Sequence, residues 1–562
     1  MLISLFILSS LFGNAQTDAR ESAYTFNKKL GRGINFMASK INHGYHDPFD
    51  FELINKNKFT HVRIGSRVWQ YVGEAPDYTI DNEKLLSYKN AVDWALEHNL
   101  MVMMDPIHAW EDYSDADLPM LIKLWEQFAI MFADYPLDKV AFEIFNEPRS
   151  YDFDLGDMLN SCIDNIRSIS GNEERIIIVS GQSFSTRQAL IDAFNDNVVF
   201  PTDDPYLIGT FHYYDPRPFT KQGDTGPVYW ANGGDEDPEW EEVIEKFQEV
   251  ADANQNWADI NNTEPLPIYN GEFGVDNGAP TQDRISWLWW IRMVSEQMDF
   301  SNAIWNLYKN TANSKGVGPW TSTEMNDPSS RTLDQYVLDP YRNRYEGEKA
   351  LIESGFMIEP WEGSSDDSLV SIYNGTAGDQ FTLQDVYIGR SGEYDATLRY
   401  QNNGSDTVFL QITSATNSQN LETLVLKLPP SEQAWTSVTI PLQYQAGTDN
   451  KMILRLQSIA ESFHFDYLVI SKGVYYDNLY PSIVSDVFLS ATSEIKKTNL
   501  KVYPNPGNHI INIEGLFKHW VLYSSSGQEL ISGTEHQLNV ASLKDGMYIL
   551  MIDENPVKFV VK

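Results

Sequence analysis

Between Leu30 and Glu353 the sequence alternates short apolar runs with amphipathic stretches, and this alternation limits the possible folds more than any other feature. Apolar residues recur three and four positions apart in 82–98 and 117–133, as on one face of a helix. Runs expected as strands are 33–37, 60–64, 101–105, 140–145, 176–179, 207–211, 268–270 and 303–305. Eight such β/α units predict a closed (β/α)8 TIM barrel, in the α/β class. A doubly wound open sheet is the alternative, but no glycine-rich phosphate loop follows the first run.

The chain has 562 residues, which is too long for one core, so we expect several domains. Residues 2–12 form an apolar run too short to cross a bilayer, followed by Gly13-Asn14-Ala15, which is typical of a secretory signal peptide. Alternating runs separated by Gly, Asn and Pro after the barrel predict an antiparallel β-sandwich, and a small β domain ends the chain. The expected divisions are a signal peptide 1–15, a barrel 24–358, a sandwich 369–473, a linker 474–497 and a C-terminal domain 498–562.

The composition excludes several partners. The formal net charge is -38, with 79 acidic residues against 41 basic ones, so nucleic acid is a poor partner and a neutral substrate is more natural. The 15 Trp and 29 Tyr suggest exposed rings, on which the flat apolar faces of sugars stack. The one cysteine, Cys162, cannot form an internal disulfide, and we expect it to be a small core residue.

The fourth apolar run, 140–145, has the pattern of a strand buried on both faces and stops at Asn146-Glu147-Pro148. Proline cannot continue a strand ladder, so Glu147 is expected where the strand ends and a loop begins. The carboxyl ends of barrel strands supply catalytic residues. On this stretch alone, an ordinary strand end with a solvated Glu remains the alternative.

Polar side chains recur in or just after the other expected strands, and under the barrel prediction they face one mouth. The candidates are Arg63, His108, Asn146, Glu147, His212, Tyr214, Glu272 and Trp305. Two carboxylates flanking a bond are the minimum for glycoside hydrolysis, and an arginine beside one of them would keep it ionised. A metal site is the rival interpretation, but closely spaced ligand motifs are missing and an arginine in the cluster disfavours a cation. We therefore predict no metal there.

Six motifs in order resemble glycoside hydrolase family 5, the cellulase-type barrel. They are Arg63, Ile107-His108, Asn146-Glu147-Pro148, Phe211-His212-Tyr213-Tyr214, Gly271-Glu272-Phe273-Gly274 and Ala303-Ile304-Trp305. The resemblance implies a retaining mechanism, with Glu147 as acid/base and Glu272 as nucleophile. The negative charge of Glu272 should raise the pKa of Glu147, because it disfavours a second negative charge nearby.

The resemblance also implies roles for the other candidates. Asn146 would bind the 2-hydroxyl of the sugar, and Arg63, His212 and Tyr214 would orient Glu272 by hydrogen bonds. His108 would line the pocket of the same sugar, and the Trp305 ring would stack on that sugar. Barrel packing is the alternative for His108 and Tyr214. For the loop residues Trp69, Trp110, Trp230 and Trp320, ordinary packing is an equally good interpretation.

The expected sandwich resembles a family 6-type carbohydrate-binding module in the segments 391–400, 434–436 and 463–468. The resemblance implies that Tyr400 and Trp435 hold a sugar between their rings, with core packing as the alternative. Such modules often hold a structural calcium ion, but the sequence does not indicate its ligands.

The last domain resembles a type IX secretion sorting domain. The motifs are Tyr503-Pro504-Asn505-Pro506, a strand at Asn512-Ile513, Tyr523-Ser524-Ser525-Ser526-Gly527 and Leu543-Lys544-Asp545-Gly546-Met547-Tyr548. This implies contact with a secretion machinery and a secreted or surface-attached protein. Another adhesive β domain is the alternative.

Taken together, these features predict a secreted, retaining endo-β-glycanase that acts on β-1,4-glucan, needs no cofactor and is a monomer. β-Mannan, mixed-linkage glucan, xyloglucan and xylan remain alternative substrates, because the same barrel accommodates each. A non-catalytic polysaccharide-binding protein built on an inactive barrel is an alternative of a different class. The presence of both Glu147 and Glu272 argues against it.

Overall fold

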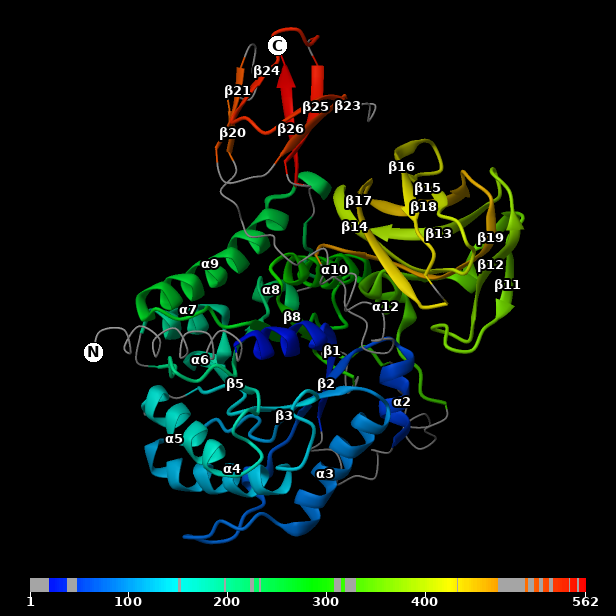
Figure 1. Cartoon of the computed structure of the whole chain (residues 1–562). Helices are drawn as coiled ribbons and strands as arrows, with labels where there is room; N and C mark the ends of the chain where they lie inside the picture. Colours follow the sequence, from blue (N-terminus) through cyan, green and yellow to red (C-terminus); the bar gives the residue numbers. More distant parts are fainter. Residues whose placement is uncertain are drawn as a thin grey trace. The chain divides into compact units, whose positions relative to one another are not determined.

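Eight parallel strands close into a barrel, and helices surround them (Figure 1). The strands are β1 (Arg32–Met37), β2 (His61–Gly65), β3 (Met101–Asp105), β4 (Val140–Glu143), β5 (Ile177–Ser180), β6 (Leu207–Tyr213), β7 (Ile268–Phe273) and β8 (Ser301–Ile304). β1 pairs with both β2 and β8, which closes the sheet. The predicted TIM barrel is confirmed. β4 ends at Glu143, two residues earlier than expected, although the Ile144 amide still donates to the Ile178 carbonyl.

The computed structural model describes residues 20–562 apart from 38–47, 150–152, 197–198, 223–226, 232–233, 308–314, 319–329, 432, 474–500, 504–509, 515–518, 525–528, 545, 553–554 and 562. The predicted signal peptide 1–15, the linker 474–497 and Trp320 lie outside these residues. Among the described residues, no helix is both long and apolar enough to cross a membrane.

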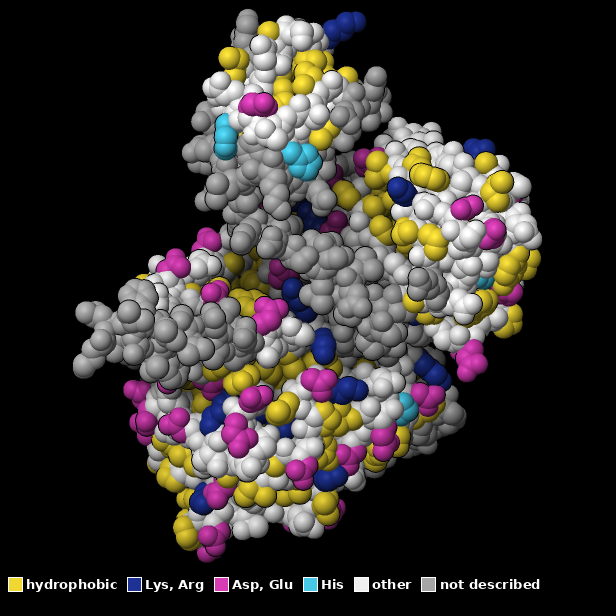
Figure 2. Space-filling view, viewed as in Figure 1, with side chains coloured by type: hydrophobic (Ala, Val, Ile, Leu, Met, Phe, Trp, Pro, Cys, Tyr) yellow, Lys and Arg dark blue, Asp and Glu magenta, His cyan; other side chains and the backbone are white. Residues whose placement is uncertain are grey.

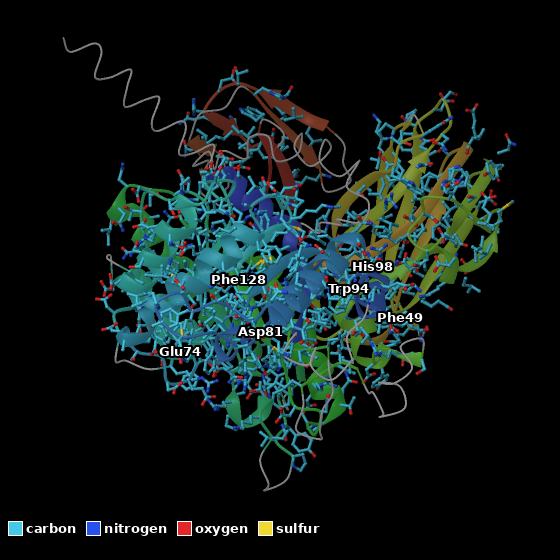
Figure 3. The ribbon with its side chains drawn as sticks, turned by 90° about the horizontal axis from the view of Figure 1, so that it is seen from below. Phe49, Glu74, Asp81, Trp94, His98 and Phe128 are labelled. Atoms are coloured by element: carbon cyan, nitrogen blue, oxygen red, sulfur yellow. The ribbon has the colours of Figure 1, made fainter. Side chains whose placement is uncertain are left out.

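The barrel helices are a first helix at 20–30, α2 (Pro48–Lys56), α3 (Asn82–Glu97), α4 (Leu118–Met131), α5 (Leu155–Ser168), α6 (Gln182–Ser185), α7 (Arg187–Asn195), α8 (Arg217–Thr220), α9 (Pro238–Asn261), α10 (Thr281–Gln297) and α12 (Gln335–Arg342). α3 illustrates why they form. The Asp81 carboxylate accepts from the Lys84 amide and caps the start of α3; Asp81 and Trp94 are labelled in Figure 3. Trp94 packs on Phe51 of α2.

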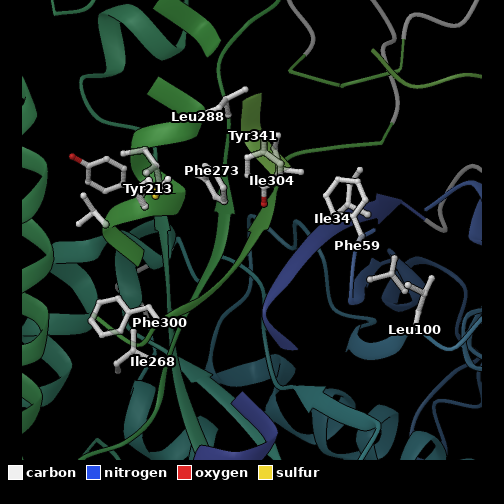
Figure 4. Close-up of a cluster of buried hydrophobic side chains, with 14 of the residues drawn as sticks. Ile34, Phe59, Leu100, Tyr213, Ile268, Phe273, Leu288, Phe300, Ile304 and Tyr341 are labelled. Atoms are coloured by element: carbon white, nitrogen blue, oxygen red, sulfur yellow. The ribbon is translucent and has the colours of Figure 1, made fainter. Parts of the chain in front are cut away.

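Two apolar layers hold the barrel together. The inner layer fills the barrel with Met101, Met103, Ala141, Ile178, Ile208, Tyr269 and Ala303, joined by Ala23, Phe26 and Leu30 of the first helix. Asn27 fixes that helix to the amino ends of β7 and β8, because it donates to the Ile268 carbonyl and accepts from Ser301. The outer layer lies between strands and helices, where Phe273 and Ile304 pack near Leu288 and Tyr341 (Figure 4). Because the first helix closes the amino end of the barrel, the carboxyl end is the one open to a substrate.

The β-sandwich consists of two antiparallel sheets. One has the order β10-β13-β18-β15-β16 and the other β11-β12-β19-β14-β17, with β9 also paired to β19. The strands are β9 (Arg344–Glu346), β10 (Leu351–Ser354), β11 (Met357–Pro360), β12 (Ser368–Gly375), β13 (Gln380–Ile388), β14 (Gly392–Asn402), β15 (Val408–Ala415), β16 (Asn420–Leu428), β17 (Thr436–Tyr444), β18 (Gly447–Leu456) and β19 (Ala460–Ser471).

The boundary expected between barrel and sandwich needs correction. β9, β10 and β11 lie within or just after the predicted barrel range 24–358, yet they pair with strands of the sandwich. These three strands are short, and most side chains of β10 and β11 are exposed, so they lack the alternation that reveals a half-buried strand. Tyr387 joins the two parts: its hydroxyl lies 2.9 Å from Ser286 Oγ of α10.

Residues 485–562 form a separate compact unit. One of its sheets has the order β20-β21-β24 and the other β23-β22-β25-β26. The strands are β20 (Lys501–Tyr503), β21 (Ile510–Glu514), β22 (Trp520–Ser524), β23 (Glu529–Gly533), β24 (Gln537–Asn539), β25 (Gly546–Ile552) and β26 (Asn555–Val561). Ile511, Ile513, Leu522 and Leu550 are among its buried core residues. The predicted motif at Pro504–Pro506 lies outside the described residues.

Candidate active site

The side chains predicted at the strand ends meet at the carboxyl end of the barrel. Arg63 projects from β2, Asn146 and Glu147 follow β4, His212 and Tyr213 end β6 with Tyr214 just beyond, and Glu272 projects from β7. A bulge in β7 sets their alignment: β6 and β7 pair Phe211 with Asn270, then His212 with Glu272, so Gly271 is an extra residue. A Cβ at Gly271 would lie 2.8 Å from Thr210 Oγ1, so only glycine fits without displacement.

Arg63 is the centre of the hydrogen-bond network. Its Nε lies 2.6 Å from Glu143 Oε2, and its Nη2 lies 2.8 Å from Glu143 Oε1, a two-bond pairing of planar groups. Its Nη1 donates to Glu272 Oε1 at 2.8 Å. Burial alone would lower the pKa of the Arg63 guanidinium, but Glu143, Asp105 and Glu272 together raise it well above its usual value. Arg63 is therefore a permanent cation beside Glu272.

Both carboxylate oxygens of Glu272 accept hydrogen bonds. Oε1 accepts from Arg63, and Oε2 accepts from the Tyr214 hydroxyl at 2.9 Å. Desolvation, together with the charge of Glu272, raises the pKa of Tyr214 well above its usual value, so the phenol keeps its proton and donates. These two donors hold the Glu272 side chain in place and stabilise negative charge on both of its oxygens, as attack by a carboxylate requires.

Glu147 has a different environment from the one predicted. His212 Nδ1 lies 3.0 Å from its Oε1, and Arg149 Nη2 lies 3.3 Å from its Oε2. Burial alone would raise the pKa of Glu147, but the hydrogen bond and charge of His212, with His108 and Arg149, lower it to about 2. The expectation that Glu272 raises this pKa is therefore wrong for the enzyme without substrate, because the nearest groups are cationic.

His212 also differs from its predicted role. Its hydrogen bond goes to Glu147, whereas Glu272 Oε2 lies 3.6 Å away. Burial alone would lower the pKa of His212, but Glu272 and Glu147 raise it above its ordinary value. His212 therefore carries the proton that Glu147 lacks, and it neutralises one of the two carboxylates.

The two carboxylates are close together. One oxygen of Glu147, one oxygen of Glu272 and a nitrogen of His212 all lie within 4.8 Å of one another. Among the described residues these are the ones that could converge on a metal ion. However, Arg63 and Tyr214 already donate to both oxygens of Glu272, and the guanidinium would repel a cation.

Two aromatic groups stand beside the carboxylates. The rings of His108 and Trp305 stack with centroids 5.5 Å apart and planes 5° from parallel. His108 Nδ1 lies 2.6 Å from Asp105 Oδ2, which fixes the ring, and Trp305 remains half-buried. The Trp305 ring, held in place by this stacking, has a face on which a sugar can stack. Asn146 uses its Oδ1 to accept from Arg63 at 2.7 Å, which leaves its Nδ2 as the donor.

The loop tryptophans behave differently from one another. Trp69 is half-buried and stacks on Trp110, with centroids 4.9 Å apart, and its Nε1 donates to the His108 carbonyl. Trp110 and Trp230 are buried in the core. Trp69 therefore supports the wall that contains His108, and the other two pack as ordinary core residues.

Four residues of this network were not predicted: Asn35, Asp105, Glu143 and Arg149. Asn35 accepts from Arg63 Nη1 at 2.9 Å, and Asp105 lies 3.2 Å from Arg63 Nη2. A signal was present for two of them, because Asp105 and Glu143 are acids within or at the end of apolar strands. A buried acid needs a cationic partner, which here is Arg63.

The sandwich residues predicted to bind sugar do not present open rings. Tyr400 is 3% exposed and packs on Phe463, and Trp435 is 8% exposed. The guanidinium of Arg399 covers the Trp435 ring at 4.3 Å, and Asp466 holds that guanidinium. The expectation that these two rings are free to stack on a sugar is therefore corrected, because both are occupied by neighbouring side chains.

Comparison with known proteins gives two family matches. Residues 31–311 match the family described as cellulase (glycosyl hydrolase family 5), and residues 501–562 match the secretion system C-terminal sorting domain. The sorting domain identifies the protein as secreted or attached to the cell surface.

Individual relatives are similar over the barrel. Endoglucanase H of Acetivibrio thermocellus is 31% identical over 291 residues, which cover 50% of this chain and 30% of that protein. Endoglucanase A of Ruminococcus albus is 26% identical over 260 residues, covering 42% of this chain and 66% of that protein. The chain thus spans less than two thirds of the length of these relatives. Among solved structures, endoglucanase Cel5A of Thermotoga maritima is 26% identical, with a TM-score of 0.48 and coverage of 57% of this chain and 99% of that one.

Proposed function

Because the chain belongs to glycoside hydrolase family 5, we propose that it hydrolyses β-1,4-linked glucan as a secreted, retaining endo-β-glycanase. The observation that carries the proposal is the spacing of Glu147 and Glu272, which have oxygens within 4.8 Å of each other. Retaining enzymes hold their two carboxyl groups about 5–5.5 Å apart, whereas inverting enzymes leave about 6.5–9.5 Å for a water molecule. The narrow gap supports double displacement.

In the first step, Glu272 attacks the anomeric carbon. Its charge is maintained by Arg63 and Tyr214, and Glu143 holds Arg63 in place. A bond forms between a Glu272 oxygen and the anomeric carbon while the bond to the leaving oxygen breaks. The electron pair of the broken bond goes to the leaving oxygen, which needs a proton at the same moment.

Glu147 delivers that proton, and His212 supplies it. In the enzyme without substrate, the raised pKa of His212 and the lowered pKa of Glu147 favour the proton on His212, whose Nδ1 lies 3.0 Å from Glu147 Oε1. The proton passes from His212 to Glu147 and from Glu147 to the leaving oxygen, so Glu147 is a carboxylate and His212 is neutral when the first step ends. In the second step Glu147 accepts a proton from water and returns it to His212, the water oxygen attacks the anomeric carbon, and Glu272 is released as a carboxylate.

The choice of β-1,4-glucan is supported by the relatives, which are named endoglucanases. The Trp305 ring and the Asn146 amide would contact the sugar attacked by Glu272. β-Mannan, mixed-linkage glucan, xyloglucan and xylan fit the same groups. We further propose that the protein is a monomer and that the reaction needs no cofactor. The β-sandwich would bind carbohydrate through residues other than Tyr400 and Trp435, and it would hold a structural calcium ion.

A panel of these polysaccharides with detection of new reducing ends tests the activity. Proton NMR of the fresh product tests the mechanism, and we expect the β-anomer to appear first. If the α-anomer appears first, the reaction inverts and Glu272 is not the nucleophile. If the wild-type protein binds these polysaccharides and releases no reducing ends, the alternative of a non-catalytic binding protein is correct.

A further inference from the structure

A cavity of about 570 Å³ opens beside Glu147, and we propose that it binds an acidic substituent of the glycan. This inference rests on the proposed hydrolase function. The basic residues that line the cavity are Arg149, Arg187, Arg217, Lys221 and Lys315, against two acids, Glu147 and Asp215. Five cations around one cavity are unexpected in a chain whose formal net charge is -38.

The cavity lies on the side of the leaving group. Glu147, His212 and Tyr214 line it, whereas Glu272, His108 and Trp305 do not. The sugar attacked by Glu272 must lie against Glu272 and Trp305. Because Glu147 protonates the leaving oxygen, the departing sugars lie beyond that oxygen, on the side of Glu147 away from the sugar that Glu272 attacks. The cavity is therefore placed to contact the part of the glycan that departs in the first step.

The five cations are not equally available. Arg149 pairs with Glu111 and Glu147, and Arg187 pairs with Glu249. Arg217 and Lys221, at the two ends of α8, are exposed and form no ion pair within the described part of the chain. These two residues supply the uncompensated charge.

Lys315 completes the cluster from the loop after β8. Its Nζ lies 2.6 Å from Asp276 Oδ1 and 5.6 Å from the centre of the Tyr214 ring. Burial lowers the pKa of Lys315; Asp276 opposes this effect, and the charges of Lys221 and Arg217 add to it. Arg217 and Lys221 therefore repel Lys315, and a bound anion would relieve that repulsion.

This arrangement favours an anion rather than a neutral sugar. Guanidinium and ammonium groups bind carboxylates and sulfates by charge-assisted hydrogen bonds, which are stronger than those to hydroxyls. Acidic side chains are scattered over the barrel surface in view (Figure 2), but at about 0.15 M salt, charges more than about 8 Å away are largely screened. The local cations then decide what the cavity binds. The ligand is a β-glycan with a carboxylate or sulfate ester on its departing part.

The test compares three soluble polymers with one backbone: carboxymethyl cellulose, cellulose sulfate and neutral hydroxyethyl cellulose. In the double variant Arg217→Gln, Lys221→Gln, we expect the ratio of kcat/KM on an anionic polymer to kcat/KM on the neutral one to fall about tenfold. The control is Lys28→Gln, Lys56→Gln. It removes two cations from the first helix and the end of α2, near the closed end of the barrel, and should leave the ratio unchanged.

The two anionic polymers distinguish a carboxylate from a sulfate preference, because each ratio is measured separately. An equal ratio in wild type and in the Arg217, Lys221 variant, for both polymers, overturns the proposal while leaving the hydrolase function intact.

A binding measurement separates this inference from the proposed function. Gel mobility of the Glu272→Gln protein, with and without the two cavity substitutions, is compared in gels containing each polymer at about 0.15 M salt. Loss of retardation by an anionic polymer, specific to the cavity substitutions, supports the anion site even if the wild-type protein hydrolyses none of the polymers. Equal retardation of the two proteins overturns it.

Discussion

His212 Nδ1 lies 3.0 Å from Oε1 of Glu147, so the imidazole is hydrogen-bonded to the proposed acid rather than to the nucleophile. Glu272 Oε2, at 3.6 Å, is the more distant carboxylate. One cation therefore sits between two anions, and the proton needed for catalysis is shared by His212 and Glu147. The pH dependence of the enzyme should follow this pair.

The first prediction concerns His212→Asn, which keeps hydrogen-bonding groups but cannot titrate. In the wild type, Glu272 and Glu147 raise the pKa of His212 above 6.5, so the pair loses its proton only above that pH. Without His212, Glu147 must hold the proton alone, and a carboxyl group releases it at lower pH. We expect the basic limb of the kcat/KM profile to move to lower pH, with a loss at pH 7 of about 100-fold.

The control is His98→Asn, which lies at the end of α3 (Figure 3). His98 comes just before the amino end of β3, away from the carboxyl ends of the strands, so this variant should leave the profile as it is. A His212→Asn profile with the wild-type basic limb would contradict proton sharing.

The second prediction separates the two carboxylates. Glu272→Ala removes the attacking group and should leave little turnover of any substrate. Glu147→Ala should be less harmful on aryl glycosides, whose leaving groups need little protonation. Added azide should restore its rate and form a β-glycosyl azide, detected by NMR. A β-glycosyl azide from Glu272→Ala, together with an α-glycosyl azide from Glu147→Ala, would reverse the two assignments.

Much of this site could be predicted because a parallel barrel brings all strand ends to one mouth. The eight strand-end residues needed only correct strand order, which the apolar runs provided. The partner of His212 could not be predicted in the same way. The bulge at Gly271 sets it, and a one-residue irregularity in pairing leaves no periodic signal.

The sandwich was predicted less well for a different reason. Rings on alternating strands can face either the core or the solvent, and a shift of one residue exchanges the two faces. Tyr400 lies next to a register shift between β14 and β19 and packs on Phe463. β10 and β11 were missed because most of their side chains are exposed.

The third prediction follows from the burial of Trp435. Trp435→Ala should lower the free energy of unfolding by about 3 kcal/mol, because it empties a packed site under Arg399. Tyr373→Ala, at a ring that is 45% exposed, is the control and should change stability much less. Calorimetry of both variants tests this. If Trp435→Ala weakens retention on insoluble polysaccharide without lowering the melting temperature, the ring is a binding residue after all.

The fourth prediction concerns the sorting domain. Residues 485–562 form their own compact unit with their own core, so removing Lys501–Lys562 should leave the barrel folded. We expect the purified truncated protein to keep its kcat/KM. In the native host it should remain inside the cell, because residues 501–562 match the sorting domain. Cell fractionation with an activity assay measures both. Normal amounts of the truncated protein in the medium would contradict the role of this domain in export.

The last prediction concerns Glu143, which touches no substrate group and acts through Arg63. Glu143→Gln keeps the shape of the side chain but removes the charge that pairs with Nε and Nη2 of Arg63. Breaking a fully buried ion pair should cost about 3 kcal/mol of stability. Arg63 would then be free to tilt away from Glu272, so kcat should fall more than about tenfold while KM changes little.

The matched control is Glu296→Gln, which breaks the pairs of Glu296 with Arg32 and Arg292 at the closed end of the barrel. It should lose comparable stability and keep its kcat. Steady-state kinetics and thermal unfolding on both variants separate the two effects. A Glu143→Gln protein that loses stability but retains kcat would show that Glu143 serves the fold alone, and that Arg63 keeps its place beside Glu272 without it.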